Sequence, residues 1–478
     1  RGAEIQITEE VVKIIARRFD ETIFRQLLDK RGTEIQITEE VVKAAAGNEE
    51  SGKEILALLL GKRGTEIQIT EEVVKAAAGN EESGKEILAL LLGKRGAEIK
   101  ITEEVIEAVA GNYGSGKEIM ALFLDKRGAE IQITEEVVKA AAGNSRSGKE
   151  IMALFLDKRG AEIQITEEVV KIIARRFDET IFRQLLDKRG TEVQITEEVV
   201  KAAAGNEESG KEILALLLGK RGAEIKITEE VIEAAAGNYG SGKEIMALFL
   251  DERGAEIKIT EEVVEAAAGN EYNGKEVMAL LLDKHGGEIK ITEEVVEAAA
   301  GNYGSGKEIL ALLLDKRGGE IKITEEVVEA AAGNEGSGKE ILALLLNKRG
   351  GEIPITEEVV KAAAGNEESG KEILALLLNK RGAEITITEE VLKAAAGNEY
   401  NGKEVMALLL DRRGDEITIT EEVVKAAAGN DENGEKVMAL LLDKRGAEIQ
   451  ITEGVIKAAA ETGACARVYA SPPRLAGI

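Results

Sequence analysis

The chain has 478 residues, of which 44% are hydrophobic but only 3% are aromatic, and its formal net charge at pH 7 is −27. This hydrophobic content excludes wholesale disorder and predicts a folded core built from aliphatic side chains. The acidic balance is expected to repel nucleic-acid backbones and anionic membranes, so neither is predicted as a partner.

Residues that commonly build metal or redox sites are scarce. The single cysteine, Cys465, excludes a disulfide framework and favours a reducing, cytoplasmic setting. The single histidine, His285, stands where most repeats have arginine and is interpreted as a solvated helix end. Helix capping explains paired glutamates such as Glu9 and Glu10, and no Asp-rich calcium loop occurs, so no metal or other cofactor is expected. Aliphatic runs such as 55–60 are too short to span a membrane.

One unit recurs along almost the whole chain. Its Ile-Thr-Glu signature begins at residues 7, 37, 69, 101, 133, 165, 195, 227, 259, 291, 323, 355, 387, 419 and 451, with twelve intervals of 32 residues and two of 30. Such self-similarity is typical of a solenoid, because one short unit cannot bury its helices without neighbours. The sequence predicts a single array over residues 1–460, with fourteen full units and the first helix of a fifteenth. An aperiodic tail is expected at 461–478.

The two 30-residue variant units lie at 7–36 and 165–194. Residues 1–36 and 159–194 differ only at Ile35 versus Val193, which indicates copying of whole units. Both variants replace the alanine-rich segment of the other units with Ile-Ile-Ala-Arg-Arg-Phe. A tighter hairpin or a local bend is predicted at these units.

The unit at 37–68 represents the 32-residue repeats. Thr38 is a good N-cap for a first helix that runs through 41–46, and Gly47-Asn48 is predicted to end it in a left-handed C-cap. Ser51-Gly-Lys-Glu54 matches a capping box and predicts a second, strongly apolar helix. Glycine at position 64 is expected to stop that helix.

A short extended connector follows at Glu66-Ile-Gln-Ile69. These connectors could pair as a parallel ladder, although Pro354 in one of them argues against a complete one. The predicted fold class is therefore mainly α. It is an α-solenoid of two-helix, 32-residue repeats with one extended Glu-Ile-x-Ile connector per repeat.

The segment Gly111-Asn-Tyr-Gly-Ser-Gly-Lys117 has the G-x-x-x-x-G-K spacing of a nucleotide-binding P-loop. That motif needs Ser or Thr after its lysine and a strand before its first glycine. Here Glu118 follows the lysine, a predicted helix precedes the glycine, and the pattern occurs eleven times. It is interpreted as a helix C-cap followed by an N-cap, and neither a nucleotide nor a catalytic residue is predicted.

The loop between the two helices varies while the apolar framework hardly changes. The candidate ligand-binding surface consists of its most distinctive residues, which are Tyr113, Arg146, Tyr239, Tyr272, Tyr303 and Tyr400. Exposed loop tyrosines are common at protein interfaces, but tolerated surface variation is the alternative.

Two further sequence positions vary together, one at the centre of the connector and one in the first helix. Where the connector centre is lysine, as at Lys100, the residue seven positions later is glutamate, as at Glu107; elsewhere that residue is lysine. Charge pairing across the surface and copying of whole units both explain this pattern.

The placed helices give the unit a resemblance to the ankyrin repeat. The resemblance is carried by Thr38, by Ala44-Ala-Ala46-Gly47, and by Lys53-Glu-Ile-Leu-Ala-Leu-Leu-Leu60 followed by Gly64-Thr-Glu-Ile. The ankyrin opening Thr-Pro-Leu-His is Thr-Glu-Glu-Val here, and the hairpin is shorter. More narrowly, residues 397–430 resemble the repeat arrays at the C-terminal end of fungal NACHT- or NB-ARC-type immune receptors, which implies a recognition role.

These observations predict a non-catalytic scaffold for recognising a protein or another macromolecular ligand. The resemblance implies the sensor array of a fungal immune-type receptor. The alternative is a self-associating, filament-forming solenoid, because near-identical units can continue end to end.

Overall fold

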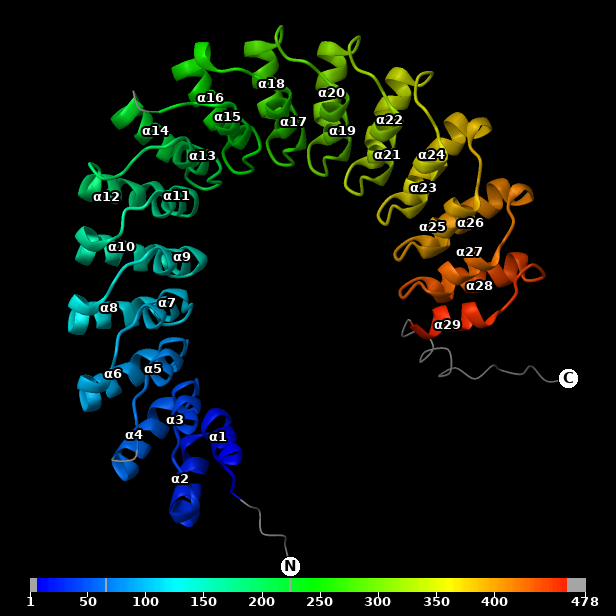
Figure 1. The fold of residues 1–478 in the computed structure, drawn as a ribbon. Helices are drawn as coiled ribbons and strands as arrows, with labels where there is room; N and C mark the ends of the chain where they lie inside the picture. The colour runs from blue at the N-terminus through cyan, green and yellow to red at the C-terminus, as the bar shows by residue number, and fades with distance from the viewer. Residues whose placement is uncertain (1–6, 65–66, 223–224, 462–478) are drawn as a thin grey trace, which may run out of the picture. The chain divides into compact units, whose positions relative to one another are not determined.

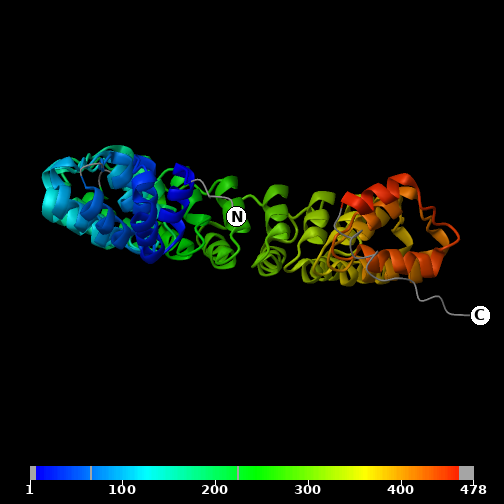
Figure 2. The same ribbon diagram turned by 90° about the horizontal axis from the view of Figure 1, so that it is seen from below.

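The computed structural model describes residues 7–64, 67–222 and 225–461. Its contacts divide the chain into two units, residues 1–226 and 227–478, and each is treated separately below. Within each unit, helix pairs of consecutive repeats stack side by side (Figures 1 and 2). Among the described residues the elements are α-helices and short 3-10 turns, without a strand. The predicted α-solenoid of two-helix repeats is confirmed.

The first helix of each repeat begins directly after the threonine of Ile-Thr-Glu. Thr70, for example, has extended backbone angles of φ −82° and ψ 168°, and its Oγ1 accepts a hydrogen bond from the Val73 amide. The first helices of residues 1–226 are α1 (Glu9–Arg18), α3 (Glu39–Ala46), α5 (Glu71–Ala78), α7 (Glu103–Gly111), α9 (Glu135–Gly143), α11 (Glu167–Arg176) and α13 (Glu197–Ala204). Those of residues 227–478 are α15 (Glu229–Ala236), α17 (Glu261–Gly269), α19 (Glu293–Gly301), α21 (Glu325–Gly333), α23 (Glu357–Gly365), α25 (Glu389–Gly397), α27 (Glu421–Ala428) and α29 (Glu453–Glu461).

The second helix of each repeat ends at a basic residue. In residues 1–226 these helices are α2 (Glu21–Arg31), α4 (Gly52–Arg63), α6 (Gly84–Arg95), α8 (Gly116–Arg127), α10 (Gly148–Arg159), α12 (Glu179–Arg189) and α14 (Gly210–Arg221). In residues 227–478 they are α16 (Gly242–Arg253), α18 (Gly274–His285), α20 (Gly306–Arg317), α22 (Gly338–Arg349), α24 (Gly370–Arg381), α26 (Gly402–Arg413) and α28 (Gly434–Arg445). In several repeats a 3-10 turn follows, such as η1 (Gly32–Glu34).

The core of each unit lies between two helical layers. First helices contact the first helices of adjacent repeats, and second helices contact second helices. In α5 the valines at 73 and 74 and the alanines at 77 and 78 are fully buried, and in α6 so are Ile87, Leu88 and Leu91. The small alanines let neighbouring first helices approach closely, so the aliphatic composition is sufficient for the core.

The predicted left-handed C-caps are wrong. Gly47 has φ −87° and ψ −2°, and among the described residues no glycine has a positive φ. The helical turn instead continues into Gly47, whose amide donates to the Lys43 carbonyl at 3.0 Å. The absence of a side chain at Gly47 instead leaves space for Arg17 of the preceding repeat.

The connectors are extended but do not form a parallel ladder. One isolated bond, from the Gln164 amide to the Ile133 carbonyl at 3.4 Å, is the nearest approach to pairing among the described connectors. Stacked helices lie about 9–10 Å apart, whereas paired strands need about 4.8 Å. The helix spacing thus keeps adjacent connectors too far apart for strand pairing.

An arginine side chain bridges this distance instead. Arg445, the last residue of α28, donates to the carbonyls of Gly414 and Ile417 in the preceding connector at 2.9 and 2.8 Å. His285 takes this position in α18, where it is half-buried rather than fully solvated, and its Nδ1 lies 3.5 Å from Glu288. Arginine therefore ties successive connectors together in most repeats.

The tighter hairpin predicted for the 30-residue units is confirmed. Only Phe177 and Asp178 separate α11 from α12, and the Asp178 carboxylate caps α12 by accepting from the Ile181 amide at 3.1 Å. Phe182 is fully buried and supplies the bulk that alanines do not. The shorter loop also leaves two arginines at the end of the first helix.

Candidate binding surface

A buried asparagine fixes the interhelix loop of each 32-residue repeat. The Asn270 side chain, 1% exposed, donates from Nδ2 to the carbonyls of Ala236 and Asn238 in the preceding repeat at 2.9 and 3.0 Å. Its Oδ1 accepts from the amides of Tyr272 and Asn273 at 3.2 and 3.1 Å. The buried members of this asparagine ladder are Asn48, Asn80, Asn112, Asn144, Asn206, Asn238, Asn270, Asn302, Asn334, Asn366, Asn398 and Asn430. Each asparagine side chain therefore joins the backbone of its own loop to the backbone of the preceding repeat.

The predicted capping boxes of the second helices do not form. Ser115 precedes α8 without a side-chain capping bond, and its backbone angles are φ −121° and ψ 13°. Its Oγ instead donates to the Asn80 carbonyl of the preceding repeat at 3.2 Å, while its amide donates to Asn112 Oδ1 at 2.8 Å. The serine is thus an inter-repeat contact rather than a cap.

The five predicted loop tyrosines all lie on the surface. Exposed fractions are 43% for Tyr113, 44% for Tyr239, 75% for Tyr272, 52% for Tyr303 and 68% for Tyr400. The rings of Tyr239 and Tyr272 are neighbours, with centroids 5.6 Å apart and an interplanar angle of 51°. Neighbouring repeats of residues 227–478 therefore bring at least two of these side chains together.

Contacts with the next repeat restrain the tyrosine loops. The Tyr113 hydroxyl donates to the carbonyl of Gly143, the last residue of α9, at 3.0 Å. Asn273 Nδ2 donates to the Tyr239 carbonyl at 2.7 Å, and Asn433 Nδ2 does the same to Tyr400 at 2.6 Å. An exposed aromatic side chain on a fixed backbone loses little entropy on binding a partner.

Arg146, the sixth predicted residue, is exposed at the corresponding loop of the repeat that begins at 133. Its amide donates to Asn144 Oδ1 at 3.1 Å, so the ladder fixes its backbone as well. It belongs to residues 1–226, as Tyr113 does, whereas the other four predicted residues belong to residues 227–478.

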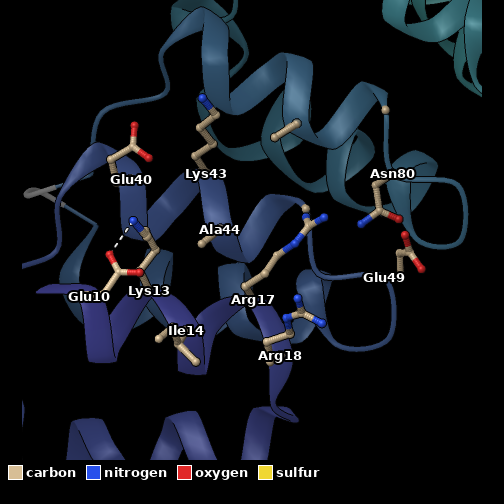
Figure 3. A pocket seen from close by; sticks show the side chains of 13 residues that line it. Glu10, Lys13, Ile14, Arg17, Arg18, Glu40, Lys43, Ala44, Glu49 and Asn80 are labelled. Atoms are coloured by element: carbon tan, nitrogen blue, oxygen red, sulfur yellow. Dashed lines mark ion pairs between the residues drawn. The ribbon is translucent and has the colours of Figure 1, made fainter. Parts of the chain in front are cut away.

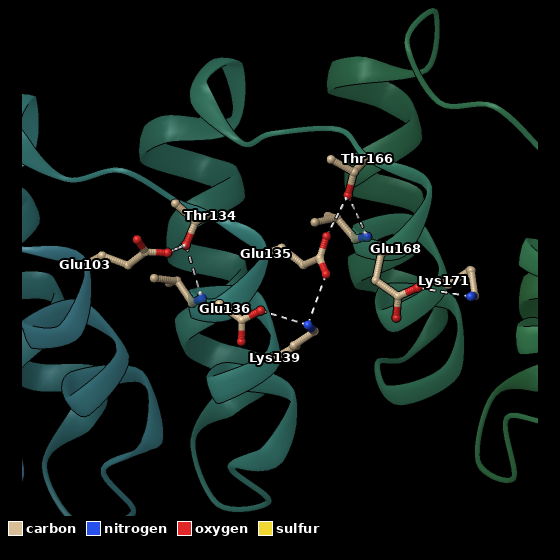
Figure 4. Close-up of polar contacts among 10 residues, drawn as sticks. Glu103, Thr134, Glu135, Glu136, Lys139, Thr166, Glu168 and Lys171 are labelled. Atoms are coloured by element: carbon tan, nitrogen blue, oxygen red, sulfur yellow. Dashed lines mark hydrogen bonds and ion pairs between the residues drawn. The ribbon is translucent and has the colours of Figure 1, made fainter.

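The outward face of the first helices carries a row of ordered charges (Figure 4). Thr166 Oγ1 donates to Glu135 of the preceding repeat at 3.3 Å, and Lys139 pairs with both Glu135 and Glu136. The same bond joins Thr70 to Glu39 and Thr388 to Glu357 at 2.6 Å each. In these repeats the first glutamate of the pair therefore reaches the next repeat's threonine, a role that capping alone does not predict, whereas the hydroxyls of Thr260, Thr292 and Thr324 have no such partner.

The two positions that vary together, in the connector and in the first helix, do not form the hypothesised charge pairs. Among the described residues neither the connector lysines nor the helix glutamates of these repeats make an ion pair; they are Lys100, Lys226, Lys258, Lys290 and Lys322, and Glu107, Glu233, Glu265, Glu297 and Glu329. Burial raises the pKa of Glu107, and the carboxylates of Glu103 and Glu136 add to the effect. Where this position is lysine, its charge is paired in most repeats; the hydrogen bond from Lys43, for example, lowers the pKa of Glu72.

The P-loop spacing does not form a phosphate cradle. The residues before Gly111 form α7 rather than a strand, and Lys117 lies exposed in the first turn of α8. A phosphate-binding loop also needs several free amides around one point, whereas the Gly114 and Ser115 amides both donate to Asn112 Oδ1. The asparagine ladder thus uses the donors that a nucleotide would need.

Other chemical sites are not built by the described part of the chain. Within residues 7–64, 67–222 and 225–461, no group of three or more His, Cys, Asp or Glu is placed to hold a metal ion. The helices in these ranges are also too short or too polar to cross a bilayer. Cys465 and the predicted tail from 462 onward lie outside the described residues.

The stacked helix pairs and the inter-repeat ladders place the protein in the class of helical-repeat solenoids. More specifically, the chain belongs to the family described as "Domain of unknown function (DUF7104)". The family model matches residues 1–17, 27–55, 58–87, 90–120, 122–152, 154–175, 185–213, 216–246, 248–278, 280–309, 312–341, 344–373, 376–406, 408–438 and 440–465. A search of curated proteins finds no match to the chain.

Solved structures with a detectable likeness include pentatricopeptide repeat proteins. PPR10 in complex with an 18-nucleotide psaJ RNA element has a TM-score of 0.41 and 13% identity, over 94% of this chain and 70% of that one. PPR10 from maize has a TM-score of 0.25 and 10% identity, over 96% of this chain and 76% of that one. Likeness at these TM-scores does not transfer a ligand to this chain.

The expectation that excludes nucleic acid as a partner is wrong as drawn. The solved structures with this likeness include PPR10 in complex with RNA, so the exclusion of nucleic acid is withdrawn. The net charge of −27 describes the whole chain, whereas binding depends on local surface charge.

Proposed function

We propose that the protein is a non-catalytic binding scaffold that recognises a protein partner through one face of residues 227–322. The repeats that begin at 227, 259 and 291 combine the exposed Tyr239, Tyr272 and Tyr303 with Glu233, Glu265 and Glu297 on the first helices. This coincidence of exposed aromatic rings and glutamates without an ion pair supports the proposal. The candidate residues Tyr113, Arg146 and Tyr400 extend the same kind of surface in other repeats.

The chemistry of this face favours a partner with basic and apolar side chains. Tyrosine offers a large contact area with few rotatable bonds, and its loop backbone is already fixed. Carboxylates without an intramolecular partner attract lysine and arginine, and they steer association as well. A basic protein segment that lies across the loops would satisfy both groups.

Selection of peptides from a random display library on the full chain tests this proposal. We expect enrichment of sequences that contain Lys or Arg beside aromatic or aliphatic residues. Replacing Tyr239, Tyr272 and Tyr303 together by serine should weaken a selected peptide at least about tenfold, because buried interface tyrosines commonly cost about 1 kcal/mol or more each. Titration by fluorescence anisotropy measures the loss.

A matched control separates this face from general charge effects. Glu233, Glu265 and Glu297 changed to glutamine should weaken binding of the basic peptide. The same change at Glu244, Glu276 and Glu308 removes equal charge from the second helices of the same repeats. Equal losses in the two triple variants, or unchanged binding by the tyrosine variant, would contradict the proposed face.

The biological context proposed for this scaffold is the recognition array of a fungal immune-type receptor in the cytoplasm. The sequence resemblance at 397–430 supports it. The coding sequence upstream of Arg1 is the decisive observation, because such a receptor carries a NACHT- or NB-ARC-type nucleotide-binding module there. An upstream module of another class would exclude this context and leave the binding surface untouched.

End-to-end self-association is a second candidate, favoured by two identical segments in different surroundings. Phe19 and Ile23 are 47% and 41% exposed, whereas their copies Phe177 and Ile181 are 6% and 1% exposed. The copies are covered by the preceding repeat, as the contacts of α11 with α9 and of α12 with α10 show. Within residues 1–226, the apolar face of a 30-residue unit therefore packs against a repeat that precedes it.

A second copy of the chain would supply such a repeat, because near-identical repeats can stack on one another. Sedimentation velocity over a concentration series should show growing assemblies, and the double change Phe19→Ser and Ile23→Ser should abolish them. A monomer that persists at every concentration would rule out this candidate.

A further inference from the structure

We infer that the two 30-residue units form matching arginine-lined hollows, each of which binds an acidic peptide segment. The basis lies in residues 1–226 and goes beyond the tyrosine face proposed above. Helix α1 ends at Arg17 and Arg18, and α11 ends at Arg175 and Arg176. All four side chains are exposed, and among the described residues none has a hydrogen-bond or ion-pair partner. The arginines that end the second helices, by contrast, hold neighbouring connectors.

The two hollows share the arginine pair and the loop of the following repeat, and residues 141–149 of the preceding repeat, with Phe177 and Asp178, line the second hollow in addition. One, of about 330 Å³, is lined by Arg17, Arg18 and residues 47–50; the other, of about 420 Å³, includes Arg175, Arg176 and residues 205–208. An adjoining hollow of about 570 Å³ shares Arg17 and Arg18 (Figure 3). Recurrence at both short units follows from their sequence, because each lacks the two residues that fill the loop elsewhere.

The following repeat positions one guanidinium of each pair. A Cβ added to Gly47 would lie 1.7 Å from Arg17 Nη1, and one added to Gly205 would lie 1.8 Å from Arg175 Nη1. Each guanidinium thus lies against the backbone at the C-terminal end of the next first helix, where the helix dipole favours a cation. No carboxylate takes part in this contact, so the N–H groups that do not face the glycine stay available to a ligand.

The hollow selects for carboxylates spaced along a chain. Two adjacent guanidinium groups present planar donor pairs, which match carboxylates in a bidentate geometry. Glu49 and Glu50 line one hollow, and Glu207 and Glu208 line the other. These carboxylates disfavour a ligand that is negative at every position. A peptide in which acidic residues alternate with neutral ones avoids that repulsion.

Fluorescence anisotropy with a labelled peptide of alternating Asp and Ser, eight residues long, tests the inference on the full chain. We expect two equivalents bound per chain. The change of Arg17 and Arg18 to glutamine should remove one equivalent, and that of Arg175 and Arg176 the other. The quadruple variant should weaken binding at least tenfold, while Arg→Lys at the same four positions should give an intermediate loss, because charge persists without the bidentate geometry.

Two controls keep the inference falsifiable. Lys53→Gln together with Lys85→Gln removes two exposed positive charges outside the hollows and should leave both equivalents intact. Unchanged thermal midpoints of the arginine variants, measured by circular dichroism, should show that the fold persists. A loss of binding in the Lys53→Gln and Lys85→Gln control equal to the loss in the Arg→Gln variants would overturn the inference. Tighter binding of a labelled 20-nucleotide single-stranded RNA, lost in the same arginine variants, would overturn the assignment to a peptide.

Discussion

Replacing Asn270 by alanine is expected to lower the free energy of unfolding by about 3 kcal/mol. The substitution removes two donated bonds, to Ala236 and Asn238, and two accepted ones, and it leaves buried backbone groups without partners. Aspartate should cost more, because it would turn a carboxylate oxygen toward two carbonyl oxygens in a site that is 1% exposed. The expected order of stability is wild type, then alanine, then aspartate.

Guanidinium unfolding and amide hydrogen exchange together measure this effect. The amides of Tyr272 and Asn273 should exchange much faster in both variants, because they lose the acceptor Oδ1. Glu271→Ala, at an exposed position of the same loop, is the control and should change stability by less than about 0.5 kcal/mol. Variants at Asn270 that match this control would show that the asparagine ladder does not couple the repeats.

The two glycines of each P-loop-like segment should respond in opposite directions to alanine. Gly274→Ala is expected to lower stability by about 2–3 kcal/mol, because the added Cβ would lie 2.5 Å from the Ala267 carbonyl oxygen and 3.0 Å from Ile309 Cδ1. Gly269→Ala should be neutral or stabilise by up to about 1 kcal/mol, since nothing lies within 4 Å of its Cβ position and its φ is not positive.

Differential scanning calorimetry of the two single variants checks this prediction. The contrast isolates packing from backbone freedom, because both residues are helical glycines of the same repeat. The glycine that begins the second helix is buried throughout the 32-residue repeats, as at Gly52, Gly116 and Gly402. Equal effects of the two substitutions would mean that the close approach of first and second helices does not require glycine.

Helices and repeat boundaries could be predicted from the sequence because their signals are local. The threonine caps, the charged termini and the buried valines of each first helix lie within one turn of the features that they control. The hairpin of the 30-residue units was also predictable, since each of these units is two residues shorter than the others and replaces their alanine-rich segment. The helical-repeat class follows from the same periodicity.

The inter-repeat contacts were missed because their partners lie about one repeat away. Asn270 looks like a C-cap in sequence, yet its side chain donates to residues 32 and 34 positions earlier. Ser115 likewise matches a capping box but donates to Asn80. The signal that could have revealed the ladder is the constancy of this asparagine beside loop positions that vary.

The candidate surface was partly predictable for a similar reason. Exposure of the loop tyrosines follows from their position between helices, whereas the contact between Tyr239 and Tyr272 depends on how repeats stack. Charge pairing of Lys100 with Glu107, one of two explanations of the sequence pattern, does not form, which leaves copying of whole units. The arginine hollows needed the structure, since Gly47 and Arg17 belong to different repeats.

Amide hydrogen exchange of the full chain, with and without a saturating basic peptide from the library selection, tests the binding-surface account most directly. The account predicts slower exchange in the loops at 238–241, 270–273 and 302–305 and at the adjoining ends of α15, α17 and α19. The second helices α16, α18 and α20 should exchange as before. Protection confined to those second helices or to the connectors would contradict it.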